Sequence, residues 1–365
     1  MSFASKVAHI LRTEGPVSLV NRSARYAGYR ARRAMMDPRP TVEEWQQLRG
    51  SYDGRAFLLG NGPSLNQTPL HLLEGEATMC FNRFDLMLER LPWTPTFYTT
   101  IDDRVLLDTL DVVNRMSECS KHAFFPDIHP YFVDFRESIV KRPNVHWLFL
   151  DRTFFSDELP YCGINKTVAN VGIQILAYLG FTEIYLLGVD MSYTVPKSAR
   201  IEGKRDITAT EDDDESHFDP RYFGKGRKFH VPMLDETFLK FREAYEHYTP
   251  RGVQIVNSTV GGVLEEFPRR PLEEVLDVDP QESGKSFRRM VEGKLEPTAI
   301  GSFEALISSP LVGGADEVDP DWRAFQVPSE GVNPVITKWV FDYVPFGPLE
   351  GRHYFVRRDS LRDYT

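Results

Sequence analysis

A glycine-rich turn follows the first strongly apolar segment of the chain. Residues 56–60 form an apolar run typical of a buried strand, and Asn61, Gly62, Pro63 and Ser64 come directly after it. Glycines let a backbone approach a ligand closely, and exposed turn amides can hold an anion. Neither common phosphate-binding motif is present, because no Gly-Lys-Ser/Thr follows and Pro63 breaks the dinucleotide pattern. The turn is therefore either a nucleotide site or an ordinary Asn-Gly turn.

A polar stretch at residues 195–229 contains His217, and His230 follows it directly. Long polar insertions after a strand are more often lids or binding loops than core. Histidine titrates near neutrality and suits general base catalysis, although a single loop histidine is most often an ordinary surface residue. Asp190 ends another predicted strand, where a carboxylate can meet a sugar or ribose hydroxyl. The candidate catalytic residues are His217, Asp190 and His230.

Polar side chains also stand at the other predicted strand ends and at one helix start. Asp102 and Asp103 could hold Mg²⁺ beside a phosphate, or one of them could cap the next helix. A helix that begins at Thr167 favours an anion at its first turn. The candidate nucleotide-binding residues are Gly60, Asn61, Gly62, Ser64, Asn82, Thr99, Asp102, Thr167, Asn170, Gly188 and Tyr193.

Short apolar strands alternate with helices along the middle of the chain. This alternation predicts an α/β fold with a doubly wound, mostly parallel sheet. Helices are expected at 105–116, 167–179 and 234–248, and strands at 56–60, 77–82, 96–101, 121–125, 145–149, 184–189 and 253–256. We divide the chain into an N-terminal arm (1–50), a main domain (51–278) with the lid insertion at 195–229, and a small C-terminal module (279–365). The module is expected to contain strands at 335–344 and 353–358.

Composition excludes several classes of protein. The 365 residues carry a net charge of −10, which is unsuited to general nucleic-acid binding. Three cysteines are too few for a disulfide scaffold, and their spacing matches no zinc motif. No apolar run is long enough to span a membrane, and no secretory signal is visible, so a cytoplasmic location is expected.

The charge is distributed unevenly. Residues 1–40 contain eight basic and two acidic residues, and the remainder of the chain is strongly acidic. Residues 18–36 read as a basic amphipathic helix, which either lies on an anionic membrane surface or packs on its own domain. Residues 1–40 are therefore the candidate membrane-binding segment, and the location becomes cytoplasmic or peripheral at the inner membrane face.

The motifs, taken in order, resemble a known group of proteins. They are Gly-Asn-Gly-Pro-Ser-Leu at 60–65, Asn-Arg-Phe at 82–84, Thr167 at a helix start, the segment 180–190 and Ser-His-Phe at 216–218. Together they resemble the bacterial lipooligosaccharide sialyltransferases and the domain superfamily that includes the archaeal 6-hydroxymethylpterin pyrophosphokinases. The resemblance covers about residues 56–274.

The sialyltransferase resemblance implies a modified Rossmann fold that binds a CMP-sugar. It implies that Asn61, Gly62, Ser64 and Asn82 contact the nucleotide and that the insertion at 195–229 closes over the donor. The base of that family is a lid histidine in a Ser-His-Tyr-x-x-His pattern. Here His217 matches the first histidine of the pattern, and Arg221 stands where the base would be. Asn165 replaces a family arginine before the Thr167 helix, and Tyr193 is displaced by one position from a family tyrosine.

The favoured expectation is a nucleotide-sugar-dependent glycosyltransferase, with a CMP-sugar donor and a glycan or lipid-linked acceptor, that works in surface polysaccharide or glycolipid synthesis. It needs no metal cofactor, and His217 or His230 would be its base. One alternative is a pyrophosphokinase that uses Mg²⁺-ATP, with Asp102, Asp103 and Asp190 as metal candidates. The other is a non-catalytic nucleotide-binding protein.

Overall fold

The fold is taken from a computed structural model of the chain. It describes residues 31–278 apart from 89, 92, 129–134, 153 and 203–205, and separate residues between 12 and 29. In the C-terminal region it describes four strands. They are β12 (Thr298–Ala299), β13 (Ala324–Pro328), β14 (Tyr343–Leu349) and β15 (Arg352–Arg357).

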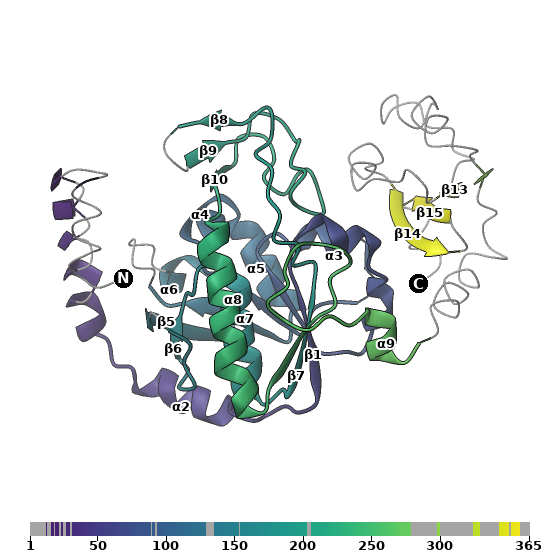
Figure 1. The fold of residues 1–365 in the computed structure, drawn as a ribbon. Coiled ribbons are helices and arrows are strands. Elements are labelled where there is room, and N and C mark those ends of the chain that lie inside the picture. Colours follow the sequence, from purple (N-terminus) through teal and green to yellow (C-terminus); the bar gives the residue numbers. More distant parts are fainter. Residues whose placement is uncertain are drawn as a thin grey trace.

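The centre of the main domain is an eight-stranded sheet in the order β11-β7-β1-β2-β3-β4-β5-β6 (Figure 1). All of its neighbouring strands pair in parallel, which confirms the predicted α/β class. The strands are β1 (Arg55–Leu59), β2 (Thr78–Phe81), β3 (Phe97–Thr99), β4 (His122–Pro126), β5 (Val145–Arg152), β6 (Tyr161–Gly163), β7 (Glu183–Leu187) and β11 (Gln254–Asn257).

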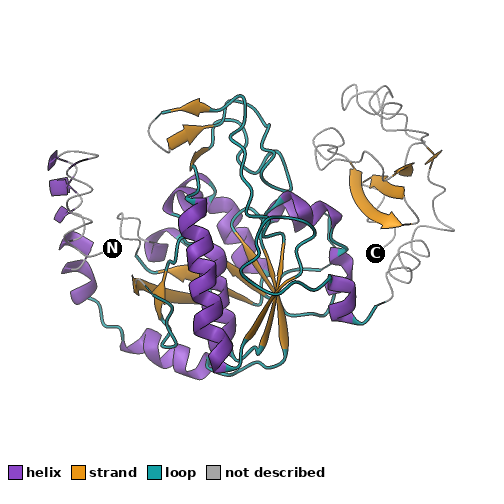
Figure 2. Cartoon of the chain, viewed as in Figure 1, coloured by secondary structure: helices purple, strands orange, loops and turns teal. Residues whose placement is uncertain are grey.

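Helices cover both faces of this sheet (Figure 2). Alternate residues of each strand face opposite sides, so Leu58 and Phe81 join the apolar cluster beneath α7 and α8. Phe57 and Cys80 join the cluster that contains residues of α5. The helices are α2 (Arg39–Leu48), α3 (Asp85–Leu88), α4 (Asp103–Asp108), α5 (Leu110–Cys119), α6 (Phe135–Ser138), α7 (Val168–Leu179), α8 (Leu234–Tyr248) and α9 (Leu272–Leu276).

The strand order reverses beside β1. From β1 the chain builds β2 to β6 on one side, whereas β7 and β11 add to the other side. Ligands of open α/β sheets bind outside the carboxyl ends of the strands at such a switch point. The end of β1 and the end of β7 therefore define where a site is expected.

Individual residues determine where two of the predicted helices begin, end or break. Thr167 caps α7 by accepting a hydrogen bond from the Ala169 amide at 3.3 Å, and Gly180 ends the helix with a φ of 111°. The helix expected at 105–116 is instead α4 followed by α5. Thr109 separates the two with a φ of −140°, and its buried hydroxyl bonds the carbonyl of Val105.

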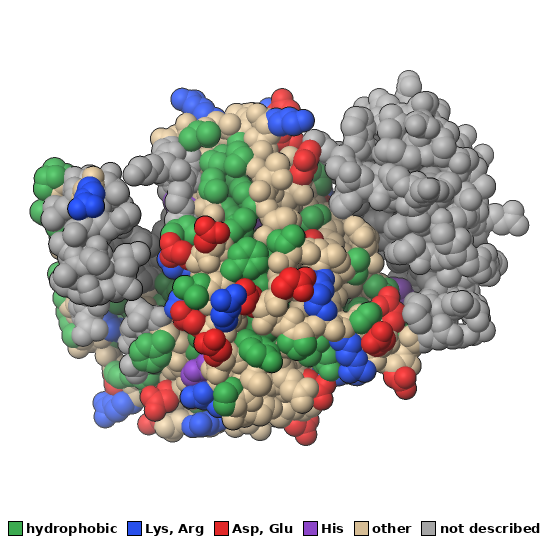
Figure 3. Space-filling view, in the orientation of Figure 1, with side chains coloured by type: hydrophobic (Ala, Val, Ile, Leu, Met, Phe, Trp, Pro, Cys, Tyr) green, Lys and Arg blue, Asp and Glu red, His purple; other side chains and the backbone are tan. Residues whose placement is uncertain are grey.

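The insertion after β7 folds into a small antiparallel sheet above the main one (Figure 1). Its strands are β8 (Arg200–Ile201), β9 (Asp206–Thr208) and β10 (Lys228–His230), in the order β10-β9-β8. The residues between β9 and β10 leave this sheet and return to the main domain. On the face that α8 covers, acidic and basic side chains are interspersed (Figure 3).

The C-terminal strands form a separate sheet in the order β12-β13-β15-β14. The expected break at 345–348 lies inside β14, which differs from the prediction. A strand with prolines is tolerated there because β14 is at the edge of its sheet, and its register shifts between Phe346 and Leu349. Most of the strand expected at 335–344 lies outside the described residues.

The end of the N-terminal arm packs against the main domain. Tyr29 is 2% exposed, and the Arg33 guanidinium lies 3.7 Å from the centre of the Phe149 ring. Arg33 also forms an ion pair with Asp127, whose carboxylate is fully buried. No helix among the described residues is long and apolar enough to cross a membrane. Membrane binding by residues 1–40 stays a prediction.

Candidate functional site

The turn after β1 and the end of β7 are joined through their backbones. The Gly60 amide donates to the Leu187 carbonyl at 2.7 Å, and the Gly62 amide donates to the Gly188 carbonyl at 2.9 Å. A Cβ added at Gly60 would lie 2.2 Å from the Gly188 oxygen. Glycine is required at position 60 because a side chain would push the two strand ends apart.

Asp190 and Ser64 form the next contact between the same two loops. The Ser64 hydroxyl donates to Asp190 Oδ2 at 2.7 Å, and the Ser64 amide donates to Oδ1 at 3.3 Å. Burial raises the pKa of Asp190, while the hydrogen bonds from Ser64 and the charge of His217 act against that shift. Both side chains are thus engaged with each other. The nucleotide-binding role of Ser64 and the catalytic role of Asp190 stay predictions.

A third loop, which follows β11, completes this group. Thr259 Oγ1 accepts a hydrogen bond from the Val189 amide at 3.1 Å, and the Val263 amide donates to the Asp190 carbonyl at 2.8 Å. The Asn-Ser-Thr-x-Gly-Gly sequence of this loop, which begins at Asn257, also resembles the broader superfamily, although none of its residues is among the candidate site residues above. The site is therefore built from loops of three adjacent strands.

Several polar side-chain atoms on these loops, and two beside the start of α7, have no hydrogen-bond partner among the described residues. Buried polar groups are normally paired, so a water or a ligand group is expected to bond such atoms. Three of their side chains are at least nine-tenths buried: Asn170 is 0%, Ser258 4% and Asn165 6% exposed. The atoms are Asn61 Oδ1, Asn165 Oδ1, Asn170 Oδ1, Tyr193 Oη and Ser258 Oγ.

Strained backbone is concentrated at the same edge of the sheet. Four of the five described non-glycine residues with positive φ lie after β2, after β7 or before α7. Such conformations persist where the surrounding structure holds them, which is frequent at functional sites. The four are Asn82 (50°), Asn165 (47°), Lys166 (72°) and Met191 (56°).

His217 forms a carboxylate–histidine pair with Asp214. Its Nδ1 lies 2.8 Å from Asp214 Oδ2, and the buried Asp214 carboxylate also accepts the amides of Ser216 at 2.9 Å and Phe223 at 3.2 Å. A carboxylate keeps the proton on Nδ1, which leaves Nε2 as the basic nitrogen. The ring of Tyr222 stacks on the imidazole at 3.9 Å. Asp214 is not among the candidates above, although its spacing of three residues from His217 was a usable signal.

The segment that carries His217 lies directly on the turn after β1. The Phe218 amide donates to the Asn61 carbonyl at 3.0 Å, and Asn66 Nδ2 donates to the Phe218 carbonyl at 2.9 Å. Burial raises the pKa of Asp190, and the charge of His217 is one of the groups that oppose this rise. Burial and the charge of Asp214 raise the pKa of Tyr193. The structure thus brings His217 together with the predicted residues Asn61, Asp190 and Tyr193.

Two other predicted nucleotide-binding residues are engaged inside the protein. Asn82 Oδ1 accepts the Thr100 hydroxyl at 2.9 Å, and the Asn82 side chain also bonds Tyr222. Thr99 is fully buried within β3 and donates its hydroxyl to the Phe124 carbonyl at 2.6 Å. Thr99 thus stabilises the sheet, and Asn82 helps to hold the segment that carries His217.

The helix-start candidates act as caps. Asp102 Oδ1 accepts the Val105 amide at 3.3 Å in the first turn of α4, and Thr167 caps α7. The Asp103 side chain lies outside the described residues. The residues that the structure describes contain no group of three or more side chains able to hold a metal ion.

His230 lies apart from these contacts. It is an exposed residue of β10, and it pairs with Asp206 of β9 in the small antiparallel sheet. The contacts that join His217 to Asn61 and Asp190 do not include it. His217 is consequently the stronger candidate for a base.

Comparison with known proteins identified no family. No protein-family model matches the chain, and no curated protein matches it. A solved structure titled as the MAf glycosyltransferase from Magnetospirillum magneticum AMB-1 matches at 16% identity and a TM-score of 0.40. The match covers 68% of this chain and 40% of that one, so the chain spans less than half of that protein. A likeness this distant carries no argument about function.

Proposed function

We propose that the chain is a nucleotide-sugar-dependent glycosyltransferase that uses a CMP-sugar donor. The observation that supports this most is the Asp214–His217 pair, held against the turn after β1 at the switch point of the sheet. A carboxylate-oriented histidine is an arrangement that suits proton abstraction from a hydroxyl group. The motif resemblance to sialyltransferases favours CMP over other nucleotides. The acceptor would be a glycan or a lipid-linked glycan of a surface polysaccharide or glycolipid.

The proposed step transfers a sugar by direct displacement. His217 Nε2 takes the proton of the acceptor hydroxyl as its oxygen forms a bond to the anomeric carbon of the donor. The bond between that carbon and the phosphate oxygen breaks, and the nucleotide leaves with the electron pair. Asp214 holds the imidazole in the required tautomer and stabilises the imidazolium ion that forms. This reaction requires no metal ion.

The unpaired atoms offer a chemically mixed surface to the donor. The hydroxyls of Ser258 and Tyr193 can donate hydrogen bonds to a phosphate. The amide oxygens of Asn61, Asn165 and Asn170 can accept hydrogen bonds from the amino group of a base or from sugar hydroxyls. A nucleotide sugar presents all three kinds of group.

A nucleotide panel tests the proposal. Thermal unfolding would be measured with CMP, UDP, GDP and ATP with Mg²⁺, because a ligand that binds only the folded state stabilises it by about 2.7 kcal/mol at a hundred times its Kd. CMP and CMP-sugars should raise Tm, and CMP-sugar hydrolysis should disappear in His217→Ala. Stabilisation by ATP with Mg²⁺ and not by CMP would overturn the proposal in favour of the pyrophosphokinase alternative. Nucleotide binding without turnover would favour the non-catalytic alternative.

A cytoplasmic location, peripheral to the inner face of the membrane, is part of the same proposal. A cytoplasmic enzyme with a lipid-linked acceptor would benefit from a basic arm on the anionic inner face of the membrane. Flotation with anionic liposomes should be lost when residues 1–40 are removed. Equal flotation of the full chain and of the chain without residues 1–40 would show that the arm does not bind the membrane. That result would not affect the proposed active site.

A further inference from the structure

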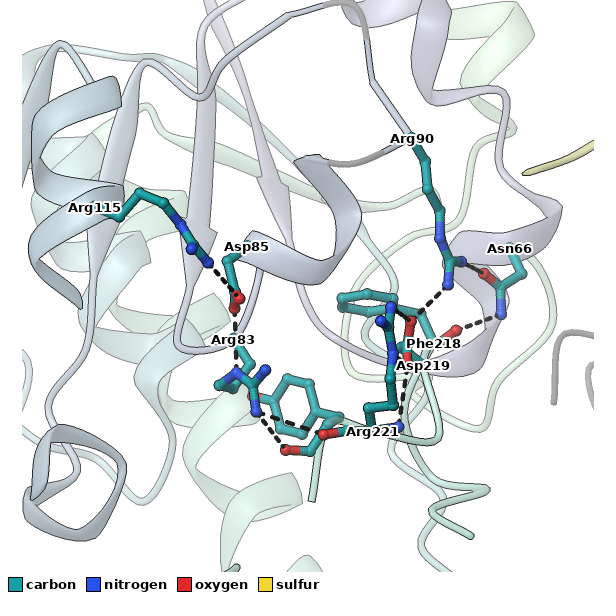
Figure 4. Close-up of polar contacts among 9 residues, drawn as sticks. Asn66, Arg83, Asp85, Arg90, Arg115, Phe218, Asp219 and Arg221 are labelled. Carbon is teal, nitrogen blue, oxygen red and sulfur yellow. Dashed lines mark hydrogen bonds and ion pairs between the residues drawn. The ribbon is translucent and has the colours of Figure 1, made fainter. Parts of the chain in front are cut away.

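Charged side chains surround the buried Asp219, which follows His217 by two residues in the sequence (Figure 4). The Asp219 carboxylate is fully buried, and Arg90 Nη2 lies 2.7 Å from its Oδ2. Arg221 donates two hydrogen bonds to the same carboxylate, from Nε to Oδ1 at 2.9 Å and from Nη2 to Oδ2 at 2.8 Å. We call Arg90, Asp219 and Arg221 the arginine clamp.

The clamp reaches the neighbour of His217 through one asparagine. Arg90 Nη1 donates to Asn66 Oδ1 at 3.0 Å, and Asn66 Nδ2 donates to the Phe218 carbonyl at 2.9 Å (Figure 4). Phe218 in turn donates its amide to the carbonyl of Asn61. The side-chain oxygen of Asn66 accepts one of these bonds and the side-chain nitrogen donates the other. A rotation that exchanged the two atoms would therefore break both bonds. The clamp, the turn after β1 and the base segment are therefore one connected unit.

Arg83 holds the other end of the same segment. Its Nη1 lies 3.5 Å from the carbonyl oxygens of both Arg221 and Tyr222, and its Nε lies 3.2 Å from Asp85. The ring of Tyr222 is the one that stacks on His217. The Arg83 side chain is 10% exposed and is bonded within the protein.

The electrostatics require Asp219 to remain charged. Burial raises the pKa of Asp219, but the hydrogen bonds and charges of Arg221 and the charge of Arg90 outweigh burial, so the pKa is lowered overall. Buried ion pairs contribute little net stability compared with apolar packing, whereas removal of one partner is costly. In some proteins such pairs instead specify one arrangement of the chain. Here that arrangement concerns the residues on either side of His217.

We propose that Asp219 is a positioning residue for His217, acting through the arginine clamp. It fixes the segment 217–222 on the turn after β1, so that the imidazole keeps its bond to Asp214 and presents Nε2 to the acceptor hydroxyl. This inference rests on the proposed function for the identity of the reaction. The clamp itself does not touch the substrate.

The experiment compares two isosteric variants of buried aspartates. Asp219→Asn removes the charge from the clamp, and Asp127→Asn removes the charge of an equally buried carboxylate that pairs with Arg33, three strands away from β1. Both variants should lower Tm. At temperatures where both are folded, Asp219→Asn alone should lower kcat about 100-fold, the scale expected of a reactive group displaced by about 1 Å, with little change in KM for the donor. Equal kcat values in the two variants would overturn the inference.

A second readout does not depend on turnover. Long-range ¹H–¹⁵N spectra report which ring nitrogen of a histidine carries the proton, and the His217 signals among the nine histidines would be assigned with His217→Gln. The proton should be on Nδ1 in the native protein and in Asp127→Asn, and distributed over both nitrogens in Asp219→Asn. An unchanged His217 signal in Asp219→Asn would contradict the inference. If the native protein turns over no nucleotide sugar but this pattern is found, the proposed function fails and the positioning role stands.

A milder variant covers the case in which Asp219→Asn does not fold. Arg221 is 32% exposed, so Arg221→Lys keeps the charge and loses the two-point contact with limited disturbance of the core. The same spectral change and a smaller fall in kcat, about 10-fold, are expected. A native tautomer and a native kcat in Arg221→Lys, with Asp219→Asn unfolded, would also reject the positioning role.

Discussion

The two halves of the sheet's carboxyl edge treat their polar groups differently. At the ends of β3 and β4, which we call the arm half, the Thr99 hydroxyl bonds the Phe124 carbonyl and Asp127 pairs with Arg33 of the arm. At the ends of β1, β7 and β11, which we call the switch half, Asn61 Oδ1 and Ser258 Oγ have no partner among the described residues. The strands are parallel in both halves, so the difference comes from the loops.

This contrast separates topology from chemistry. The reversal of strand order predicts where a ligand should bind, but it does not ensure that anything at that edge is free to bind one. The switch half has unpaired acceptors and hydroxyls together with a histidine oriented by Asp214. In the arm half, the Thr99 hydroxyl bonds within the sheet and Asp127 holds the arm. Each prediction below tests whether this division holds.

The largest effect is expected from the histidines. His217→Gln should lower kcat by about 10²–10⁴-fold and leave CMP binding intact, because it removes the base and not the nucleotide contacts. His146→Gln, in β5, breaks contacts to Glu44 at 2.5 Å and to His122 at 2.9 Å and should affect stability only. Steady-state kinetics with calorimetric Kd values for CMP check both variants. Similar kcat values for His217→Gln and His146→Gln would contradict a catalytic role for His217.

The next effect concerns close packing of the switch half. Gly60→Ala should lower the free energy of unfolding by about 1–3 kcal/mol, because the new methyl group meets the backbone oxygen of Gly188, which cannot rotate away. It should also abolish stabilisation by CMP. Gly75→Ala is the control, since Gly75 has a φ of 83° but nothing within 4 Å of the added Cβ. Denaturant titrations with and without CMP give the free energy of unfolding and its increase on CMP binding. Gly75→Ala should lower the free energy of unfolding and keep the increase with CMP. Retained CMP binding in Gly60→Ala would contradict the placement of the nucleotide site at this turn.

A pair of small substitutions compares a free polar atom with a paired one. Asn61→Ala should leave the free energy of unfolding nearly unchanged but remove most of the CMP-induced rise in Tm. Thr99→Val removes a buried hydroxyl that donates to a carbonyl and should cost about 1–3 kcal/mol, with CMP binding preserved. Thermal shift assays give both quantities. If Thr99→Val abolished CMP binding and Asn61→Ala did not, the ligand would bind in the arm half and not in the switch half.

The smallest effect is a pH dependence at the opposite edge of the sheet, where β4 begins with His122. Burial, with the nearby charges of His146 and Lys121, lowers the pKa of His122 from 6.5 to about 4. The unfolded chain therefore binds a proton as pH falls below about 6.5, whereas the folded protein does not until about 4, so stability falls across that interval. His122→Gln should flatten this part of the profile. Unfolding measured from pH 7 to 4 checks it, and an unchanged slope in the variant would exclude His122 as the cause.

The longer helices and the class of the sheet were predictable from the sequence because they depend on the local spacing of apolar residues. The expected helix at 234–248 matches α8, and the expected helix at 167–179 matches α7 with its glycine cap. The parallel class of the sheet follows from the alternation of strands and helices and is confirmed. The strand β6 and the small sheet β8–β10 were missed, since two- and three-residue strands leave no periodic signal.

The site was predictable in location but less so in detail. The turn at 60–64 and His217 could be found from residue types, whereas the partners of these residues could not. Ser64 bonds Asp190, 126 positions away, and Arg90 bonds Asp219, 129 positions away, and no spacing rule predicts contacts at such separations. Asp214 is one of several acidic residues of the insertion, and only its spacing of three residues from His217 distinguishes it in the sequence. Its role depends on the fold that places its carboxylate 2.8 Å from Nδ1 of His217.

The position of β7 beside β1 also affects the order in which the domain can assemble. As the chain leaves the ribosome, β1 can pair with β2 early, but its other edge stays open until residues 183–187 have been made. During that time the backbone of residues 55–59 is an unprotected edge, and Phe57, Leu58 and Leu59, fully buried in the finished domain, have only part of their cover. Nascent chains that stop before β7 should therefore need chaperones most. The half of the sheet that holds the proposed site is the last to close.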